Sequence, residues 1–384
     1  MHPTRSSLLA LLHRCCLLVL AALVVLADSG AWASAIRYAR TFHIEPLADG
    51  CRLVTVTPPG ATGATGLQYL LVPRDAQRPA GYPTALTIRV PVQRIVALST
   101  THLAYIAAAG QVDRLVGVSD FRYISTPEIR RRIDDHSLVQ VGDVTRLRME
   151  PLLELAPDLI LTSGGGSSFD VHPKLRETGL PAVMILEHLE TDPLGRCEWM
   201  KFLALFLGTE RHAEQLFDQI AQRYTELATR TAQARHRPTV LVNTPFQGQW
   251  WIPGGRTYLA RMIEDAGGAY LWAGLQRADT VPLDIESVYD KGLDAEVWLH
   301  AGQWNHLGDI RAADPRFAAF RSVRTGKVFN NNKRQNQWGG NDYWESGMLR
   351  PDVVLADMIA ILQPQLLPDH RLVYHQQLDK AQAR

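Results

Sequence analysis

The sequence of 384 residues lacks a surplus of charge, since 40 basic side chains stand against 39 acidic ones and the formal net charge is +1. A chain without a basic field holds a phosphate backbone poorly, so general nucleic-acid binding is disfavoured. With 46% hydrophobic residues, the chain also does not have the composition of a disordered protein. A chain of this length is long for a single hydrophobic core, so we expect two lobes or domains.

Long apolar runs are missing as well, with one exception near the start. Residues 15–26 (CCLLVLAALVVL) form an apolar stretch of about a dozen residues, which suits a signal-peptide core and is short for a membrane span. Residues 31–33 (AWA) fit a cleavage site, with residues 33–35 (ASA) as the alternative. We therefore predict a cleavable secretory signal over residues 1–33 and an exported mature protein; an uncleaved anchor is the other interpretation.

Cysteine is scarce. Cys15 and Cys16 follow Arg14 and lie at the very start of the apolar stretch, so they do not end a small-residue box of the kind that bacterial lipoproteins carry at the cleavage point. Removing the leader leaves Cys51 and Cys197, which could pair in an oxidising compartment or stay as buried free thiols. A CxxC motif is absent, which excludes a zinc knuckle or a thioredoxin-like site.

Enzyme signatures are also absent. The sequence contains no GxSxG elbow, no SxxK and no HExxH, and its 13 histidines show no convincing metal-ligand spacing. The glycines at 164–166 lack the Lys-Ser/Thr of a Walker loop and the GxGxxG spacing. We predict neither enzymatic activity nor a covalently bound cofactor, and no protein-bound metal.

What the sequence does contain is a clear change of pattern along the chain. Residues 36–90 hold short apolar-alternating runs separated by turn residues, which indicates strands and hairpins. From residue 92 onward, short continuous apolar runs alternate with helical segments, as in a parallel sheet covered by helices. The predicted parts are a signal peptide (1–33), a β-rich appendage (34–91), an N-terminal α/β lobe (92–193), a helical linker (194–237) and a C-terminal α/β lobe (238–384).

The helical linker contains a long backbone helix. Leu216, Ile220, Tyr224 and Leu227 form one apolar stripe at helical spacing, and Pro238 closes the segment. A helix of about 35–40 Å is long enough to cross between two lobes. The predicted fold class is therefore α/β, with two Rossmann-like lobes joined by a single long helix and an N-terminal β appendage.

This organisation resembles the periplasmic substrate-binding proteins of ABC importers for iron-siderophore, haem or cobalamin complexes. Residues 94–120, 141–161 and 281–299 carry the resemblance, while residues 36–90 and 330–352 depart from the smaller members. It implies a monomeric, periplasmic protein that captures an iron complex, a ferric siderophore or haem, between its lobes and delivers it to a permease and ATPase complex. A corrinoid is the alternative ligand.

The resemblance also implies two docking residues. Glu150 and Glu286 match the acidic positions, one on each lobe, that pair with arginines of the permease in this family. Such exposed charges set register and encounter rate more than affinity. Both glutamates also lie where the helix macrodipole favours a carboxylate, and the two roles are compatible.

Ligands of open α/β sheets bind at the carboxyl ends of the strands, so the residues that follow each strand are candidates. Five tryptophans in such positions favour a large planar ligand, and arginines there could contact its anionic groups. The alternatives are core tryptophans, solvated arginines and a structural histidine. The predicted ligand-binding residues are Thr101, His102, Phe121, Arg122, Gly165, Trp250, Trp251, Arg256, Trp304, Trp338, Tyr343 and Trp344.

Two other functions fit the same sequence. A secreted hydrolase could use the same cleft, and would need a nucleophile within hydrogen-bond reach of a base. A sensor subunit could bind the same ligand and signal to a membrane receptor instead of a permease.

Overall fold

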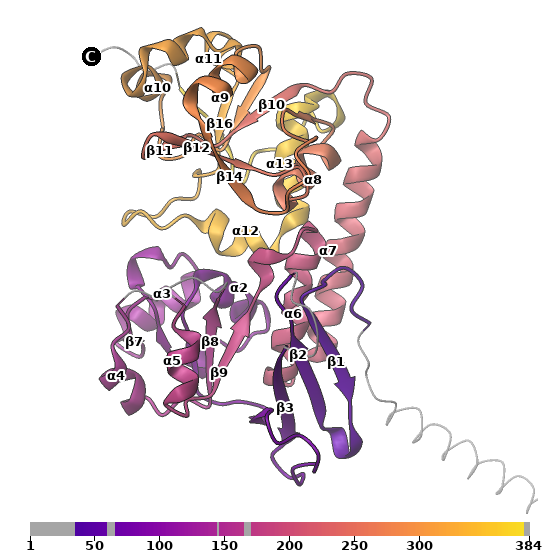
Figure 1. Ribbon diagram of the computed structural model, residues 1–384, viewed down its shortest axis with the longest axis vertical. Helices are drawn as coiled ribbons and strands as arrows, with labels where there is room; N and C mark the ends of the chain where they lie inside the picture. The colour runs from indigo at the N-terminus through magenta and orange to yellow at the C-terminus, as the bar shows by residue number, and fades with distance from the viewer. Residues whose placement is uncertain (1–34, 60–65, 144–145, 165–169, 380–384) are drawn as a thin grey trace, which may run out of the picture.

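The computed structural model describes residues 35–59, 66–143, 146–164 and 170–379 (Figure 1). In these ranges the chain forms a small N-terminal sheet, two α/β lobes and two consecutive helices between the lobes. The predicted leader, residues 1–33, and Gly165 lie outside the described residues. The α/β class with parallel sheets and a β appendage agrees with the prediction from sequence.

The N-terminal sheet uses the four predicted apolar runs. Its strands follow the order β1 (Phe42–Pro46), β2 (Arg52–Val56), β3 (Leu67–Pro73) and β4 (Leu86–Val90). The first three are antiparallel, and β3 pairs with β4 in parallel. One face, which includes Val54, Tyr69 and Ile88, joins the main hydrophobic core, so the appendage is packed into the molecule.

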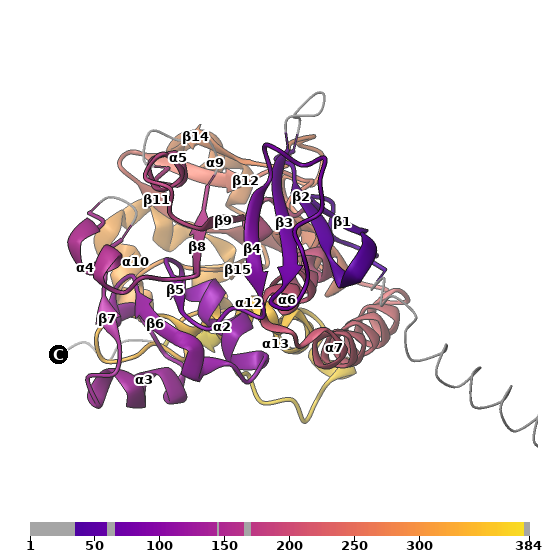
Figure 2. The ribbon, with the colours of Figure 1, turned by 90° about the horizontal axis from the view of Figure 1, so that it is seen from below.

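The N-terminal lobe is a five-stranded parallel sheet in the order β7-β6-β5-β8-β9. Its elements are β5 (Ile95–Ala97), α2 (Thr100–Ala108), β6 (Leu115–Val118), α3 (Pro127–Asp134), β7 (Val139–Gln140), α4 (Met149–Glu154), β8 (Leu159–Ser163), α5 (His172–Glu177) and β9 (Ala182–Ile185). Strands β5 and β9 are buried throughout, as their continuous apolar runs predict. Figures 1 and 2 show the N-terminal sheet beyond the β9 edge, where the Met184 backbone N–H donates to the Tyr69 hydroxyl (2.9 Å).

Two helices, α6 (Pro193–Leu207) and α7 (Glu210–Thr231), join the lobes. Every residue of α6 is buried, whereas α7 buries one side. Of the predicted stripe, Ile220, Tyr224 and Leu227 are buried, and Leu216 is partly buried. Gly208 separates them with a left-handed backbone (φ 72°), a conformation that glycine adopts without steric cost. Because α7 ends at Thr231, its 22 residues span about 33 Å, slightly less than predicted.

The C-terminal lobe has a second parallel sheet, β13-β10-β15-β16, with β17 added antiparallel at the edge. Its strands are β10 (Thr239–Val242), β13 (Ala269–Tyr270), β15 (Val297–Leu299), β16 (Val328–Asn330) and β17 (Gln376–Gln377). Its helices are α8 (Tyr258–Asp265), α9 (Ile285–Gly292), α10 (Leu307–Ala313), α11 (Arg321–Thr325), α12 (Ser346–Leu349) and α13 (Pro351–Leu362).

A separate antiparallel sheet in this lobe was not predicted. It consists of β11 (Pro245–Phe246), β12 (Gln249–Pro253) and β14 (Thr280–Asp284). Gln247 and Gly248 both have positive φ, 51° and 80°, which is the geometry of a tight hairpin turn. The segment around Trp250 is therefore itself a strand, although the sequence placed Trp250 among the residues that follow a strand.

The two cysteines of the described residues are separate. Cys51 lies under the N-terminal sheet and Cys197 lies in α6, both buried and unpaired. Of the two alternatives that the sequence left open, the structure has the free thiols.

Candidate functional site: a cleft between the lobes

The carboxyl ends of β5 and β15 both lead to the space between the lobes, where a cavity of about 630 Å³ lies. Its size is within the usual range for small-molecule sites. The N-terminal lobe contributes Thr100 and Tyr123 to its lining. The C-terminal lobe contributes Gly302, Gln303, Asn305, Asn332, Gln335, Gly339, Asn341 and Trp344.

The described lining contains amides, the hydroxyls of Thr100 and Tyr123, and two aromatic rings, but no charged side chain. Tyr123 and Trp344 are 48% and 45% exposed, so both present ring surface to the cleft. Some of the amides are held by partners: Asn332 donates to Asn305 Oδ1 (2.7 Å) and accepts from Gln376 Nε2 (2.8 Å). The cavity therefore offers a partly preorganised, uncharged hydrogen-bonding surface beside two aromatic rings.

Residues 334–345, which we call the interlobe segment, run from the C-terminal lobe onto the N-terminal lobe (Figure 1). The Asn336 amide donates to the backbone carbonyls of Arg122 (3.0 Å) and Ile124 (3.1 Å). At Gly340 an added Cβ would lie 2.7 Å from the Tyr123 Cα, so only glycine permits this approach. The wall of the cleft is thus built from both lobes.

Glu345 is the last residue of the interlobe segment, and its side chain binds the N-terminal lobe. Its buried carboxylate accepts hydrogen bonds from the backbone N–H groups of Ser125 (2.6 Å) and Thr126 (2.9 Å), and from the Thr126 hydroxyl. These donors lie just before α3, so a side chain of one lobe satisfies the start of a helix of the other. Burial raises the pKa of Glu345, although these hydrogen bonds act in the opposite direction.

A larger hollow, of about 990 Å³, lies at the amino ends of β10, β15 and β16. Its lining includes Arg230, His236, Lys327 and Gln363 and contains no residue of the N-terminal lobe. Since ligands of this fold class bind at the carboxyl ends of the strands, we assign the site to the cleft.

Three of the predicted ligand-binding residues are fully buried and lie outside the described lining of the cleft cavity. Trp250 points into the lobe, donates to the Val242 carbonyl (2.9 Å) and packs on Trp298. His102 packs inside its own lobe, with Nε2 3.2 Å from Ser163 Oγ, and burial lowers its pKa to about 4. Tyr343 is also fully buried, although its neighbour Trp344 lines the cavity.

Four other predicted residues lie outside the described lining of the cavity. Thr101 donates to Glu187 (2.7 Å), and Trp304 packs edge-on against Trp298. Phe121 is half-buried against the main core, and Trp251 is exposed on β12.

The last three predicted residues also lie outside the described lining, and each contacts another side chain. Arg122 forms an ion pair with Asp120 (2.6 Å), and Arg256 donates to Gln276 (2.9 Å). Trp338 stacks under the Arg130 guanidinium at 3.9 Å from its ring centroid.

Trp344 is the one predicted residue that lines the cavity among those that the structure describes. The amides were missed, although the sequence carries a signal for them. Residues 331–337 (NNKRQNQ) follow a strand and are rich in Asn and Gln.

The two predicted docking residues are exposed and lie in the first turns of helices. Glu150 starts α4 on one lobe and Glu286 starts α9 on the other. The Glu286 side chain is 69% exposed and lies 3.4 Å from Arg316. Within the described ranges, no helix combines the length and apolar character needed to cross a membrane. In the same ranges, no three His, Cys, Asp or Glu side chains group so as to hold a metal ion.

Comparison with known proteins agrees with this architecture. Residues 95–334, more than half of the chain, match the periplasmic binding protein family. The chain belongs to this family. The family predicted from the sequence is thereby confirmed.

Relatives of this periplasmic binding protein differ in what is known of them. An uncharacterized lipoprotein of Methanocaldococcus jannaschii is 26% identical over 317 residues, covering 79% of this chain and 74% of the relative. A cobalamin-binding protein of Halobacterium salinarum is 25% identical over 245 residues, covering 61% of this chain and 63% of the relative. A periplasmic heme binding protein from Pseudomonas aeruginosa has the same fold, with a TM-score of 0.57 at 20% identity, covering 76% of this chain and 100% of the other.

Proposed function

We propose that this protein is the solute-binding component of an ABC importer, which captures a metal complex in the cleft and delivers it to a permease. The cavity between the lobes carries this proposal, because residues of both lobes line it and the interlobe segment closes one of its walls. Membership of the periplasmic binding protein family supports capture as the task.

Among metal complexes, the lining favours a corrinoid. A corrinoid carries amide groups around its ring, which can pair with Asn and Gln side chains. Haem and catecholate siderophores carry anionic groups, and such groups need cationic partners when they are desolvated. The nearby arginines are engaged, Arg122 with Asp120 and Arg334 with Asp342 (2.6 Å). The cobalamin-binding relative also supports a corrinoid as the first candidate ligand. A ferric complex is the second candidate.

The ligand is tested by titrating the purified protein with cyanocobalamin, dicyanocobinamide, haemin, a ferric hydroxamate and a ferric catecholate. We expect tryptophan quenching by the corrinoids with a Kd below about 1 µM, and much weaker quenching by the anionic complexes. Tight binding of haemin or a ferric siderophore, with no corrinoid binding, would reverse the assignment. Failure of all five ligands would overturn the capture of a metal complex.

We also propose that Glu150 and Glu286 contact the permease. Both are exposed at helix starts on different lobes, where a charge can meet a partner without losing an internal contact other than that of Glu286 with Arg316. Glu150→Lys should reduce import by the reconstituted transporter at least roughly tenfold without changing the ligand Kd. Glu154→Lys, on the same exposed helix, is the matched control, and equal loss in both variants would contradict docking at Glu150.

The hydrolase alternative needs a nucleophile beside a base, and Ser163 with His102 is one such pair. Ser163 and His102 lie 3.2 Å apart, but His102 is fully buried, and its Nδ1 has no hydrogen-bond partner among the described residues. A catalytic histidine is normally oriented by a third group at that atom. The geometry therefore favours binding over hydrolysis, and a turnover screen with ester and amide substrates checks it.

A further inference from the structure

Side-chain amides form much of the lining of the cleft cavity, and an amide can face a partner with its oxygen or with its NH2 group. Which of the two ends faces the ligand decides what kind of ligand group the cavity can bind. A backbone partner fixes that choice, because a backbone carbonyl can only accept a hydrogen bond and a backbone N–H can only donate one.

One row of amides runs from the C-terminal strand to the cavity, and we call its three side chains the amide relay. Gln376 on β17 donates from Nε2 to Asn332 Oδ1 (2.8 Å), and Asn332 donates from Nδ2 to Asn305 Oδ1 (2.7 Å). Asn305 Nδ2 in turn makes a longer hydrogen bond to the Gln303 backbone carbonyl (3.4 Å). Asn332 and Asn305 line the cavity, whereas Gln376 lies outside its described lining.

The Gln303 carbonyl sets the direction of the amide relay. It can only accept, so it takes the NH2 group of Asn305 and turns Asn305 Oδ1 toward Asn332. Asn332 then presents its NH2 group to Asn305 and its oxygen to Gln376, which supplies a donor. Asn332 is 7% exposed, so reversing its amide alone would set like groups against each other with little water to compensate. The oxygens of Asn332 and Asn305 are therefore both occupied by the protein, and the Asn305 NH2 group keeps one hydrogen for the cavity.

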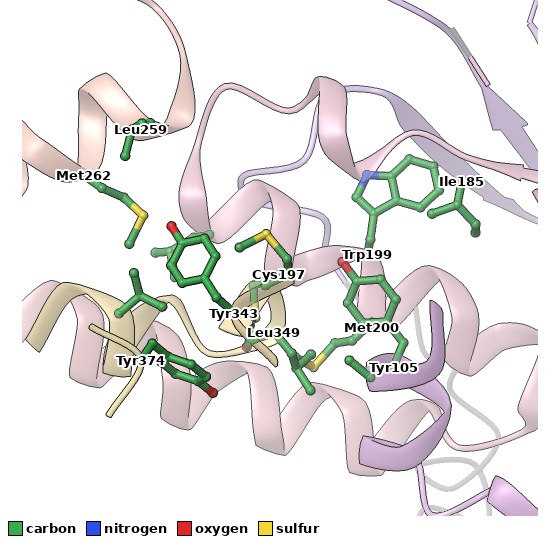
Figure 3. Close-up of a cluster of buried hydrophobic side chains, with 14 of the residues drawn as sticks. Tyr105, Ile185, Cys197, Trp199, Met200, Leu259, Met262, Tyr343, Leu349 and Tyr374 are labelled. Atoms are coloured by element: carbon green, nitrogen blue, oxygen red, sulfur yellow. Dashed lines mark hydrogen bonds between the residues drawn. The ribbon is translucent and has the colours of Figure 1, made fainter. Parts of the chain in front are cut away.

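Asn341 is a second oriented donor in the lining. Its Oδ1 accepts from the Tyr343 backbone N–H (3.1 Å), so its NH2 group is the end left for the cavity. Figure 3 shows the Tyr343 side chain in the hydrophobic core near Tyr374, which keeps this backbone N–H in place. Gln335 is the opposite case, because its Nε2 donates to the Gly339 carbonyl (3.2 Å) and its oxygen is left for other partners. The lining thus holds two oriented NH2 groups beside one available amide oxygen.

We propose that Gln376 is a positioning residue, which orients Asn332 and thereby Asn305. The NH2 groups of Asn305 and Asn341 then donate to neutral acceptor oxygens of the ligand. This role rests on the proposed function and narrows the ligand, because it requires carbonyl oxygens, such as those of amide groups, on the part that reaches these two residues. Neutral NH2 groups suit a carbonyl oxygen, but they leave a desolvated anionic oxygen without a counterion.

The test compares a donor with an acceptor at position 376, in the full-length mature protein titrated with dicyanocobinamide by calorimetry. Gln376→Lys keeps a donor toward Asn332, whereas Gln376→Glu offers only acceptors. We expect Gln376→Glu to raise the Kd about tenfold, because it opposes the orientation of Asn332 and Asn305, and Gln376→Lys to stay within about threefold of the wild type. A merely structural defect would lower the binding-competent fraction and leave the Kd unchanged.

Gln377→Glu is the matched control. Gln377 is the next residue of the same strand, and it donates to the Gly326 carbonyl (2.7 Å) outside the described lining of the cleft. Its substitution should leave the Kd at the wild-type value. Equal Kd values in Gln376→Glu and Gln376→Lys, or an equal loss in Gln377→Glu, would overturn the role of Gln376.

NMR of the ligand-free protein observes the amide relay without any ligand. The Asn332 NH2 protons should show NOEs to Asn305 in the wild type and in Gln376→Lys, and to residue 376 in Gln376→Glu. Wild-type NOEs from these protons to Gln376 would overturn the relay. If the NOEs are as expected but none of the five ligands of the panel binds, the proposed function fails and the relay does not.

Discussion

Neighbouring residues of the same type have opposite roles in this protein. Trp250 and Trp251 are adjacent on β12, yet Trp250 is fully buried and Trp251 is 42% exposed. Tyr343 and Trp344 differ in the same way, and only Trp344 lines the cleft. Side-chain direction alternates along a strand and rotates along a helix, so one position decides whether a ring reaches a ligand.

Trp344 therefore provides the prediction at the scale of the residue. Trp344→Ala should weaken ligand binding roughly fivefold to tenfold, since it removes a ring that can stack on a planar ligand. Trp251→Ala is the matched control, because Trp251 is similarly exposed but lies outside the described lining. Isothermal titration calorimetry of both variants with the best ligand of the panel measures the effect. Equal affinities would remove Trp344 from the site.

Buried carboxylates tie together segments that are far apart in sequence. Glu198 of α6 accepts hydrogen bonds from the backbone N–H groups of residues 37–39, and Glu190 accepts those of residues 40 and 41. Asp357 of α13 accepts from the backbone of residues 373–375 near the other end of the described chain. Glu345 does the same between the lobes. Each carboxylate satisfies backbone donors that would otherwise be buried without a partner.

The interlobe segment gives the prediction at the scale of the element. Glu345→Gln keeps the size of the side chain but loses the charge, and should lower the free energy of unfolding by about 1–3 kcal/mol. Hydrogen exchange should rise at Ser125 and Thr126, whose N–H groups the carboxylate now protects. Glu128→Gln, an exposed change on α3, is the control. Unchanged hydrogen exchange at residues 125 and 126 would contradict the proposed role of Glu345 in holding the interlobe segment on the N-terminal lobe.

At the scale of the whole molecule, three buried histidines predict sensitivity to acid. Burial lowers the pKa of His102 and His172 to about 4, and burial with the nearby His375 lowers that of His300 to about 3. In the unfolded chain these groups titrate near pH 6.5. Between about pH 6.5 and 4 the unfolded state therefore binds more protons, and stability falls as the pH falls.

Each histidine contributes up to about 1.4 kcal/mol per pH unit in that range. Chemical unfolding at a series of pH values should show that unfolding near pH 5 is accompanied by the binding of about three protons to these histidines. His172→Gln should reduce that uptake by about one proton. A stability that is constant from pH 6.5 to 4.5 would show that the histidines are not neutral in the folded state.

The elements of this protein were largely predictable, and the site was not. Apolar runs such as residues 94–99 and 159–163 predicted buried parallel strands, because a strand covered on both faces needs apolar side chains throughout. Helix α3 was missed because residues 127–134 are mostly charged and bury only Ile129. The β11–β12 hairpin was missed because its strands are short and its turn uses Gln247 before Gly248.

The sequence by itself determined the architecture. Periodicity and turn residues are local properties, and they are enough to place two α/β lobes, a linker of helices and strand ends that face one cleft. Tertiary structure alone decided which side chains line that cleft. His102, Trp250 and Tyr343 are buried by partners distant in sequence, and Asn336 and Glu345 bring amides to the cavity wall by bonding to the other lobe. Burial and contact across lobes depend on the whole fold, so no local pattern records them.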